Sequence, residues 1–146
     1  MRLVDVFSGA GGETEGALRA GLQVVAALNH WDVALASHRA NHPDTLHLCD
    51  DALTFDWRDL PAHEIGWLSP ECTWFTRARG SRPGPDRYAL ARGDRMRMLD
   101  VSELLSIQGF PRGYVLRGDH KDQVKQIGNA TAVSVAAWNL SHVARG

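Results

Sequence analysis

A short apolar segment that ends in a cluster of glycines lies at the start of the chain. Residues 4–12 read VDVFSGAGG, and residues 13–20 have a composition that favours a helix. A strand, a glycine turn and a helix in this order bring backbone N–H groups and a helix N-terminus close to a ligand in α/β proteins. Gly9 and Gly11 fit the dinucleotide-binding pattern, but Thr14 stands at its third glycine position. The segment therefore predicts either a ligand-binding turn of another kind or a tight turn without a ligand.

Apolar segments and helical patterns alternate along the rest of the chain. Strands are predicted at residues 3–7, 23–28, 45–49 and 65–68, and helices at residues 13–20, 31–40, 101–108 and 130–143. Such alternation is typical of a parallel sheet with helices on its faces, in which ligands bind at the carboxyl ends of the strands. We therefore expect an α/β fold, a small and mostly parallel Rossmann-like sheet flanked by helices, in a single domain over residues 1–146.

Composition narrows the class of protein. The 146 residues carry a formal net charge of −1, and no segment reaches the length of a membrane span or resembles a signal peptide. Cys49 and Cys72 are too few for a disulfide framework, which favours reduced thiols and a cytoplasmic location. His38 and His42 have helical spacing, but the Asn-His-Pro sequence at 41–43 ends a helix there, so we expect no metal site.

An excess of arginine marks residues 77–97. This segment holds seven arginines and two aspartates, together with glycines and prolines that are typical of a loop. One interpretation is a solvated connector, and the other is a basic arm that binds DNA phosphates. The position of the segment after Cys72 favours DNA binding. The expected DNA contacts are Arg77, Arg79, Arg82 and Arg87.

Several strings of residues, taken in their order, carry a resemblance to a known family. After the glycine-rich start come NHW at residues 29–31, CDD at 49–51, SPECTWFT at 69–76, IQGFP at 107–111 and QIGNA at 126–130. This series resembles the DNA cytosine-5 methyltransferases over about residues 3–76 and 97–142. The resemblance implies the S-adenosylmethionine-dependent methyltransferase fold and methyl transfer from S-adenosylmethionine to cytosine C5 in DNA. It also implies a protein encoded by a bacterium, an archaeon or a phage.

The resemblance assigns the cofactor site to the ends of successive strands. It implies that the backbone from Phe7 through the glycines holds the methionine part, that Trp31 stacks on adenine, and that Asp50 accepts from the adenine amino group. His30 stands where the family usually has the acid that binds the ribose. For the two aromatic residues, packing in the core is the alternative. The expected cofactor-binding residues are Phe7, Gly9, Ala10, Gly11, Gly12, Asn29, His30, Trp31, Asp50, Asp51, Pro70 and Asn129.

The resemblance makes Cys72 the catalytic nucleophile. A thiolate that adds to cytosine C6 makes C5 nucleophilic toward the methyl group, and the cysteine is expelled when C5 loses its proton. The neighbouring arginines favour the thiolate. Glu71 stands where the family usually has proline, and its charge disfavours the thiolate. Glu71 is also a candidate proton donor to the base edge, and the sequence leaves both roles open.

The interval between Cys72 and Arg97 is short for the family. Only 24 residues separate the two positions, and the family's base-binding glutamate, its arginine pair and its target-recognition region are absent from this interval. Three interpretations follow. The chain is a minimal methyltransferase completed by self-association or by Glu71, one part of a split enzyme with a complementary chain, or a non-catalytic remnant that binds cofactor or DNA. Arg97 itself either braces the site or is a surface arginine.

Overall fold

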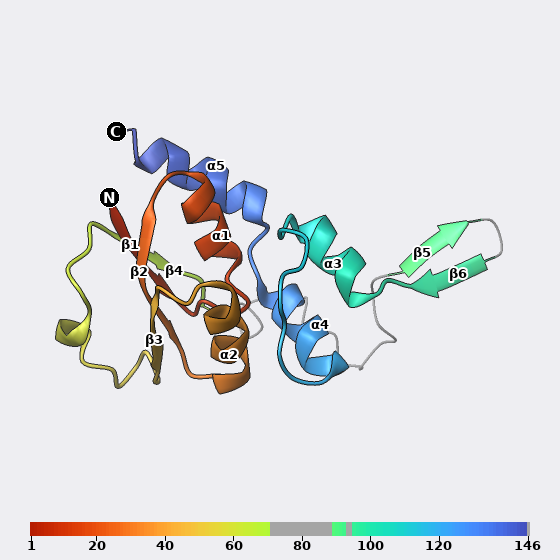
Figure 1. Cartoon of the computed structure of the whole chain (residues 1–146), viewed down its shortest axis with the longest axis horizontal. Coiled ribbons are helices and arrows are strands. Elements are labelled where there is room, and N and C mark those ends of the chain that lie inside the picture. The colour runs from red at the N-terminus through yellow and green to blue at the C-terminus, as the bar shows by residue number, and fades with distance from the viewer. Residues whose placement is uncertain (71–88, 93–94, 146) are drawn as a thin grey trace.

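The chain folds around a four-stranded parallel sheet with helices packed against it (Figure 1). The computed structural model describes residues 1–70, 89–92 and 95–145. The strand order is β3-β2-β1-β4, and every neighbouring pair is parallel. The α/β architecture predicted from the alternating pattern is therefore confirmed. The strands are β1 (Arg2–Val6), β2 (Gln23–Asn29), β3 (Leu46–Cys49) and β4 (Ile65–Leu68).

The register of the sheet aligns the carboxyl ends of the strands. Val6 pairs with Leu28 on one side and with Leu68 on the other. Asn29 pairs with Cys49, the last residue of β3. Strands β1 and β2 are the two central strands of the sheet, and residues on both of their faces are buried. Their sequences are therefore nearly continuous apolar runs. The segments that leave these strands consequently begin at one common edge.

Helix α1 packs very closely against helix α5, and the two lie side by side in Figure 1. Helix α1 spans Gly12–Arg19, and helix α5 spans Val133–Val143. A Cβ atom built on Gly16 would lie 2.4 Å from the Cβ of Ala136, and one built on Gly12 would lie 2.1 Å from the carbonyl oxygen of Thr131. Only glycine fits at these two contacts, and the glycine-rich segment thereby fixes the C-terminal helix against the first one.

Helices α2 (Asp32–Asn41), α3 (Val101–Gln108) and α4 (His120–Asn129) complete the fold. Capping boxes at Asp100 and Asp119 define where α3 and α4 begin. An apolar cluster joins these two helices to the turn before α1 and to the first residue of α5. Its members include Ala10, Leu104, Leu105, Ile127 and Val133. Sequence patterns did not predict α4, and α5 begins three residues later than the expected helix at residue 130.

The arginine-rich segment contains two strands that the sequence did not predict. Strands β5 (Ala89–Arg92) and β6 (Arg95–Met98) form an antiparallel hairpin separate from the parallel sheet. The loop predicted over residues 77–97 is therefore wrong for these two stretches, because backbone pairing between them overrides the glycine and proline signals around them. Within the described part of the chain, no helix is long and apolar enough to cross a membrane.

Candidate functional site

A pocket of about 240 Å³ opens at the carboxyl edge of the parallel sheet. Residues that follow β1, β2 and β4 form one part of its wall, and the end of α4 with the turn before α5 forms the other. This edge is where parallel α/β sheets bind their ligands. The described lining residues are Phe7, Gly9, Asn29, His30, Trp31, Ser69, Pro70, Gln126, Gly128, Asn129 and Thr131.

Most of the residues expected to bind a cofactor meet in this pocket. The structure brings together Phe7, Gly9, Asn29, His30, Trp31, Pro70 and Asn129. Five other expected residues do not line the pocket, namely Ala10, Gly11, Gly12, Asp50 and Asp51.

Phe7 turns the chain sharply where β1 ends. Its φ of 65° lies in the left-handed region, and it is the only non-glycine residue with a positive φ in the described part of the chain. Such a conformation costs on the order of 1–3 kcal/mol, so the surrounding structure must hold it. The Phe7 N–H donates to Leu28 O at 2.8 Å, which fixes the turn against β2. This turn places the aromatic ring in the pocket wall.

Asn29 and Trp31 shape the wall that follows β2. The buried Asn29 side chain accepts a hydrogen bond from the Trp31 backbone N–H at 2.9 Å. This bond fixes the turn into α2, and Trp31 is the residue that caps that helix. The ammonium of Lys125 lies 4.4 Å from the centroid of the Trp31 ring. The ring is thus held between α2 and α4, with an attractive cation–π contact on it.

The glycines at the start of α1 serve packing rather than the pocket surface. Gly11 has a φ of +91°, and a Cβ atom there would lie 2.7 Å from Tyr114 Oη and 3.0 Å from His38 Cδ2. Gly12 faces the backbone of Thr131. Ala10 is fully buried, and its carbonyl accepts a hydrogen bond from Tyr114. Residues 10–12 therefore lie behind the wall that Phe7 and Gly9 form.

Asp50 and Asp51 lie in an exposed turn after β3. The Asp50 carboxylate accepts from the Asp51 N–H at 2.7 Å, and the Asp51 carboxylate accepts from the Leu53 N–H at 2.9 Å. Both side chains therefore stabilise their own turn. Because β3 is the edge strand of the sheet, this turn does not reach the pocket lining.

Sequence reasoning missed three polar residues of the pocket: Ser69, Gln126 and Thr131. Gln126 is fully buried, and its Nε2 donates to the carbonyl of Arg117 at 2.8 Å. Its Oε1 has no hydrogen-bond partner in the described part of the chain. Membership of the QIGNA string could have identified Gln126 as a pocket residue. Ser69 and Thr131 were not identified, because they become neighbours only when α5 docks on α1.

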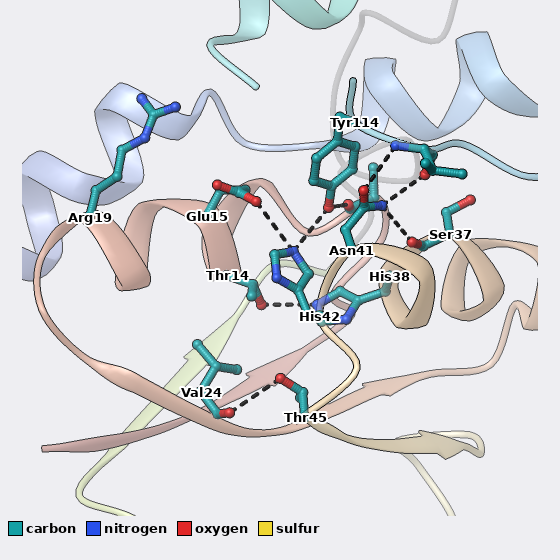
Figure 2. A network of polar contacts seen from close by, with 12 residues as sticks. Thr14, Glu15, Arg19, Val24, Ser37, His38, Asn41, His42, Thr45 and Tyr114 are labelled. Carbon is teal, nitrogen blue, oxygen red and sulfur yellow. Dashed lines mark hydrogen bonds and ion pairs between the residues drawn. The ribbon is translucent and has the colours of Figure 1, made fainter. Parts of the chain in front are cut away.

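A network of histidines connects the end of α2 with α1 and Tyr114, and Figure 2 shows His38 and His42 in it. The buried His38 contacts Thr14 Oγ1 through Nε2 at 3.0 Å and His47 through Nδ1 at 2.8 Å. His42 Nε2 lies 3.1 Å from Tyr114 Oη. Because the Tyr114 hydroxyl donates to Ala10 O, it accepts from His42, and this assigns the His42 proton to Nε2.

These histidines are held in the neutral form. Burial, followed by the nearby His42 and His47, lowers the pKa of His38 well below its usual range. Burial and then His47 lower the pKa of His42 to about 4. Burial, followed by Arg39, also lowers the pKa of His47. The described residues contain no group of three or more side chains able to hold a metal ion.

The segment before α4 is anchored on α2. The Asn41 side chain donates to Val115 O at 2.8 Å and accepts from the Val115 N–H at 2.9 Å (Figure 2). The Ser37 hydroxyl accepts from the Arg117 N–H at 2.7 Å. Residues 114–117 are thereby attached to a helix that lies far away in the sequence. This attachment places α4, and with it Gln126 and Asn129, beside the strand ends.

The predicted catalytic and DNA-binding residues lie outside the described residues. They are Glu71, Cys72, Arg77, Arg79, Arg82 and Arg87. Arg97 is described, and its guanidinium forms two hydrogen bonds of 2.7 and 2.5 Å with the Glu103 carboxylate. The Arg97 side chain is 58% exposed and forms an ion pair with Glu103 at the start of α3, and Arg97 is not among the described residues that line the pocket.

Comparison with known proteins gives one consistent family. The model of the C-5 cytosine-specific DNA methylases matches residues 74–142. Type II methyltransferase M.AgeI of Thalassovita gelatinovora is 41% identical over 56 residues, which are 38% of this chain and 13% of that protein. DNA (cytosine-5)-methyltransferase CMT2 of Oryza sativa subsp. japonica is 43% identical over 53 residues, which are 36% of this chain and 4% of that protein.

A solved structure adds a weaker likeness. A candidate DNA modification methyltransferase encoded within a prophage of E. coli is 32% identical, with a TM-score of 0.44, over 50% of this chain and 23% of that one. Among its curated relatives, the chain spans between 4% and 40% of the relative's own length.

Proposed function

Because the chain belongs to the family of the C-5 cytosine-specific DNA methylases, in a shortened form, we propose that it transfers a methyl group from S-adenosylmethionine to cytosine C5 in DNA. The observation that carries the proposal is the pocket at the strand ends. It gathers Phe7, Trp31 and Asn129 from three distant parts of the sequence. All three parts belong to strings on which the family resemblance rests.

The residues of the pocket fit an adenosine ligand that carries a cationic end. The rings of Phe7 and Trp31 offer apolar surface for a base. The buried Oε1 of Gln126 has no donor in the described part of the chain, so a ligand donor would satisfy it. The described lining residues include no carboxylate, and a hydrogen bond from Asn29 or His30 is proposed to replace the ribose-binding acid. When bound, S-adenosylmethionine supplies an electrophilic methyl group.

The proposed chemistry uses Cys72, which follows the pocket residue Pro70 by two positions. Its thiolate adds to cytosine C6, and C5 then takes the methyl group. Loss of the C5 proton restores the aromatic ring and expels the thiolate. The target base must leave the duplex to reach such a pocket. Glu71 is the proposed proton donor, and Arg77, Arg79, Arg82 and Arg87 are the proposed phosphate contacts.

Covalent trapping tests this function. DNA that contains 5-fluorocytosine allows attack and methyl transfer, but the fluorine cannot leave as a proton, so the adduct should persist. We expect a cofactor-dependent adduct with the full chain, no adduct with Cys72→Ser, and an unchanged adduct with Cys49→Ser. Cys49 is a matched control because its exposed thiol lies at the end of β3 and does not line the pocket.

The same assay separates the alternatives. Impaired trapping by Glu71→Gln would assign the proton donor to Glu71. Trapping that requires a complementary chain would identify one part of a split enzyme. S-adenosylmethionine binding without any adduct, alone or with such a chain, would contradict the catalytic proposal and favour a non-catalytic cofactor-binding protein.

A further inference from the structure

A buried carboxylate stands directly behind the wall of the pocket. Glu13 lies in the first turn of α1 and is only 2% exposed. The Ser69 hydroxyl donates to its Oε1 at 2.7 Å, and the Thr131 hydroxyl donates to the same oxygen at 2.6 Å. Both hydroxyl-bearing residues line the pocket. Carboxylates are almost never fully buried without such partners, so this arrangement calls for an explanation.

The bonds to Glu13 determine what the pocket can offer a ligand. Because each hydroxyl has one proton and gives it to Glu13, Ser69 and Thr131 can only accept from other groups. Ser69 Oγ already accepts from Trp67 Nε1 at 2.8 Å, which leaves it one further lone pair. The carbonyl of Arg117 can only accept, so the amide nitrogen of Gln126 faces it and the amide oxygen is left as an acceptor. Three side chains on this part of the wall thus offer acceptors, which suit a donor or a cation.

A second buried acid, Asp5, lies close to Glu13. Asp5 is fully buried in β1 and accepts from the Thr14 hydroxyl at 2.8 Å. Burial, and next the charge of Glu13, raise the pKa of Asp5 well above its usual range. Asp5 is therefore biased toward its protonated form. Glu13 accepts two hydroxyl hydrogen bonds, and these stabilise a carboxylate.

We propose that Glu13 is a positioning residue for the cationic end of the cofactor. Through Ser69 and Thr131 it orients two acceptors toward the pocket, and it supplies a negative charge behind a wall whose described residues include no carboxylate. The assignment rests on the proposed function. It assigns this side of the pocket to the sulfonium of S-adenosylmethionine and its neighbouring ammonium. A charge in a buried site acts over several ångströms because little water screens it.

Two ligands that differ in charge test the proposal. S-adenosylmethionine carries a positive sulfur, whereas S-adenosylhomocysteine lacks the methyl group and this charge. We would titrate both into the full chain by calorimetry and take the ratio of their affinities. Glu13→Gln keeps the shape of the side chain and removes its charge, so it should lower the ratio about fivefold in favour of the neutral ligand. A residue that only packs would weaken both ligands alike.

Glu15→Gln is the matched control, because Glu15 belongs to the same helix but faces His42 rather than the pocket. It should leave the ratio unchanged. An unchanged ratio in a cooperatively folded Glu13→Gln protein would overturn the proposal. Should that variant fail to fold, Thr131→Val removes one of the two hydroxyls at nearly constant shape, and it should lower the ratio about twofold. An unchanged ratio there would also overturn the proposal.

Failure of the proposed function has a different signature. If the unmodified chain binds neither ligand, the cofactor assignment and the role of Glu13 are overturned together. If it binds both ligands and only the ratio fails to respond, the cofactor assignment stands and Glu13 is a structural link between α1, the end of β4 and the turn before α5.

Discussion

Hydrogen bonds of the main chain position the backbone of both aromatic residues of the pocket, and Phe7 also packs against the apolar cluster of β1 and β2. The Phe7 N–H is bound to β2, and the Trp31 N–H is bound to the Asn29 side chain. Both residues stand at points where a strand has just ended. Their backbone positions are thus set without a ligand, and such preorganisation lowers the entropy cost of binding.

We expect Trp31→Ala to weaken S-adenosylmethionine binding by about 1–3 kcal/mol, the usual contribution of an aromatic side chain that stacks on a base. Calorimetry of the two proteins measures the difference. Trp138→Ala is the matched control, since Trp138 is 65% exposed on α5 and does not line the pocket. Equal affinities for the Trp31 and Trp138 variants would show that Trp31 does not stack on the ligand.

Helix α1 is short and contains glycine at two of its eight positions, Gly12 and Gly16. Glycine inside a helix costs about 1 kcal/mol relative to alanine, so propensity alone disfavours this sequence. The close approach of α5 explains the two glycines. A side chain at position 16 would meet Ala136 of α5, and one at position 12 would meet Thr131 in the turn before α5. Docking of the two helices brings Thr131 to Glu13 and completes the pocket.

Gly16→Ala should therefore lower the free energy of unfolding by about 1–3 kcal/mol, despite the better helix propensity of alanine. The new Cβ would lie 2.4 Å from the Ala136 Cβ and 2.7 Å from the Ala137 nitrogen. Denaturant titration gives the change. Ala136→Gly in the same chain should restore part of the loss, because it removes the nearest of these atoms.

Gly66→Ala serves as the control for this substitution. A Cβ atom on Gly66 would meet only Leu68 Cδ1 at 3.7 Å, which is an ordinary contact. We expect a change within about 0.5 kcal/mol. Loss of stability in the Gly66 variant as large as in the Gly16 variant would contradict the close-packing explanation.

At the scale of the whole molecule, the histidine network makes stability depend on pH. A histidine whose folded pKa is lowered stabilises the fold most above its unfolded pKa, near 6.5, and loses this contribution as pH falls. His38, His42 and His47 all act in this direction. Burial raises the pKa values of Asp5 and Glu15, whose contributions have the opposite sign.

His42→Gln isolates one histidine from these opposing groups. Between pH 6.5 and about 4, unfolding of the unmodified chain should take up about one proton more than unfolding of the variant. The cost of the substitution should therefore be largest at neutral pH and should shrink on acidification. Denaturant titrations at a series of pH values measure this difference, and the exposed His63→Gln is the control. If the stabilities of the unmodified chain and of His42→Gln changed in parallel with pH, a lowered pKa of His42 in the folded state would be contradicted.

Local sequence patterns correctly predicted the helices and strands whose apolar periodicity and terminal residues indicate the same bounds. Helix α3 and strand β4 have the predicted bounds. Helix α4 escaped prediction because only Val124 and Ile127 are apolar among its ten residues, and packing against the cluster around Tyr114 stabilises it. The strand-end rule located the aromatic half of the pocket. Glu13 could not be foreseen, since its burial depends on hydroxyls that lie 56 and 118 residues further along the chain.

The pocket wall begins at Phe7 and ends at Thr131. During synthesis, the first strand leaves the ribosome long before the turn that closes the pocket. Contacts between such distant residues form slowly, because a long loop must close before they gain anything. We therefore expect the pocket to be completed late in folding, so that binding of the proposed cofactor would mark a chain whose two ends have come together.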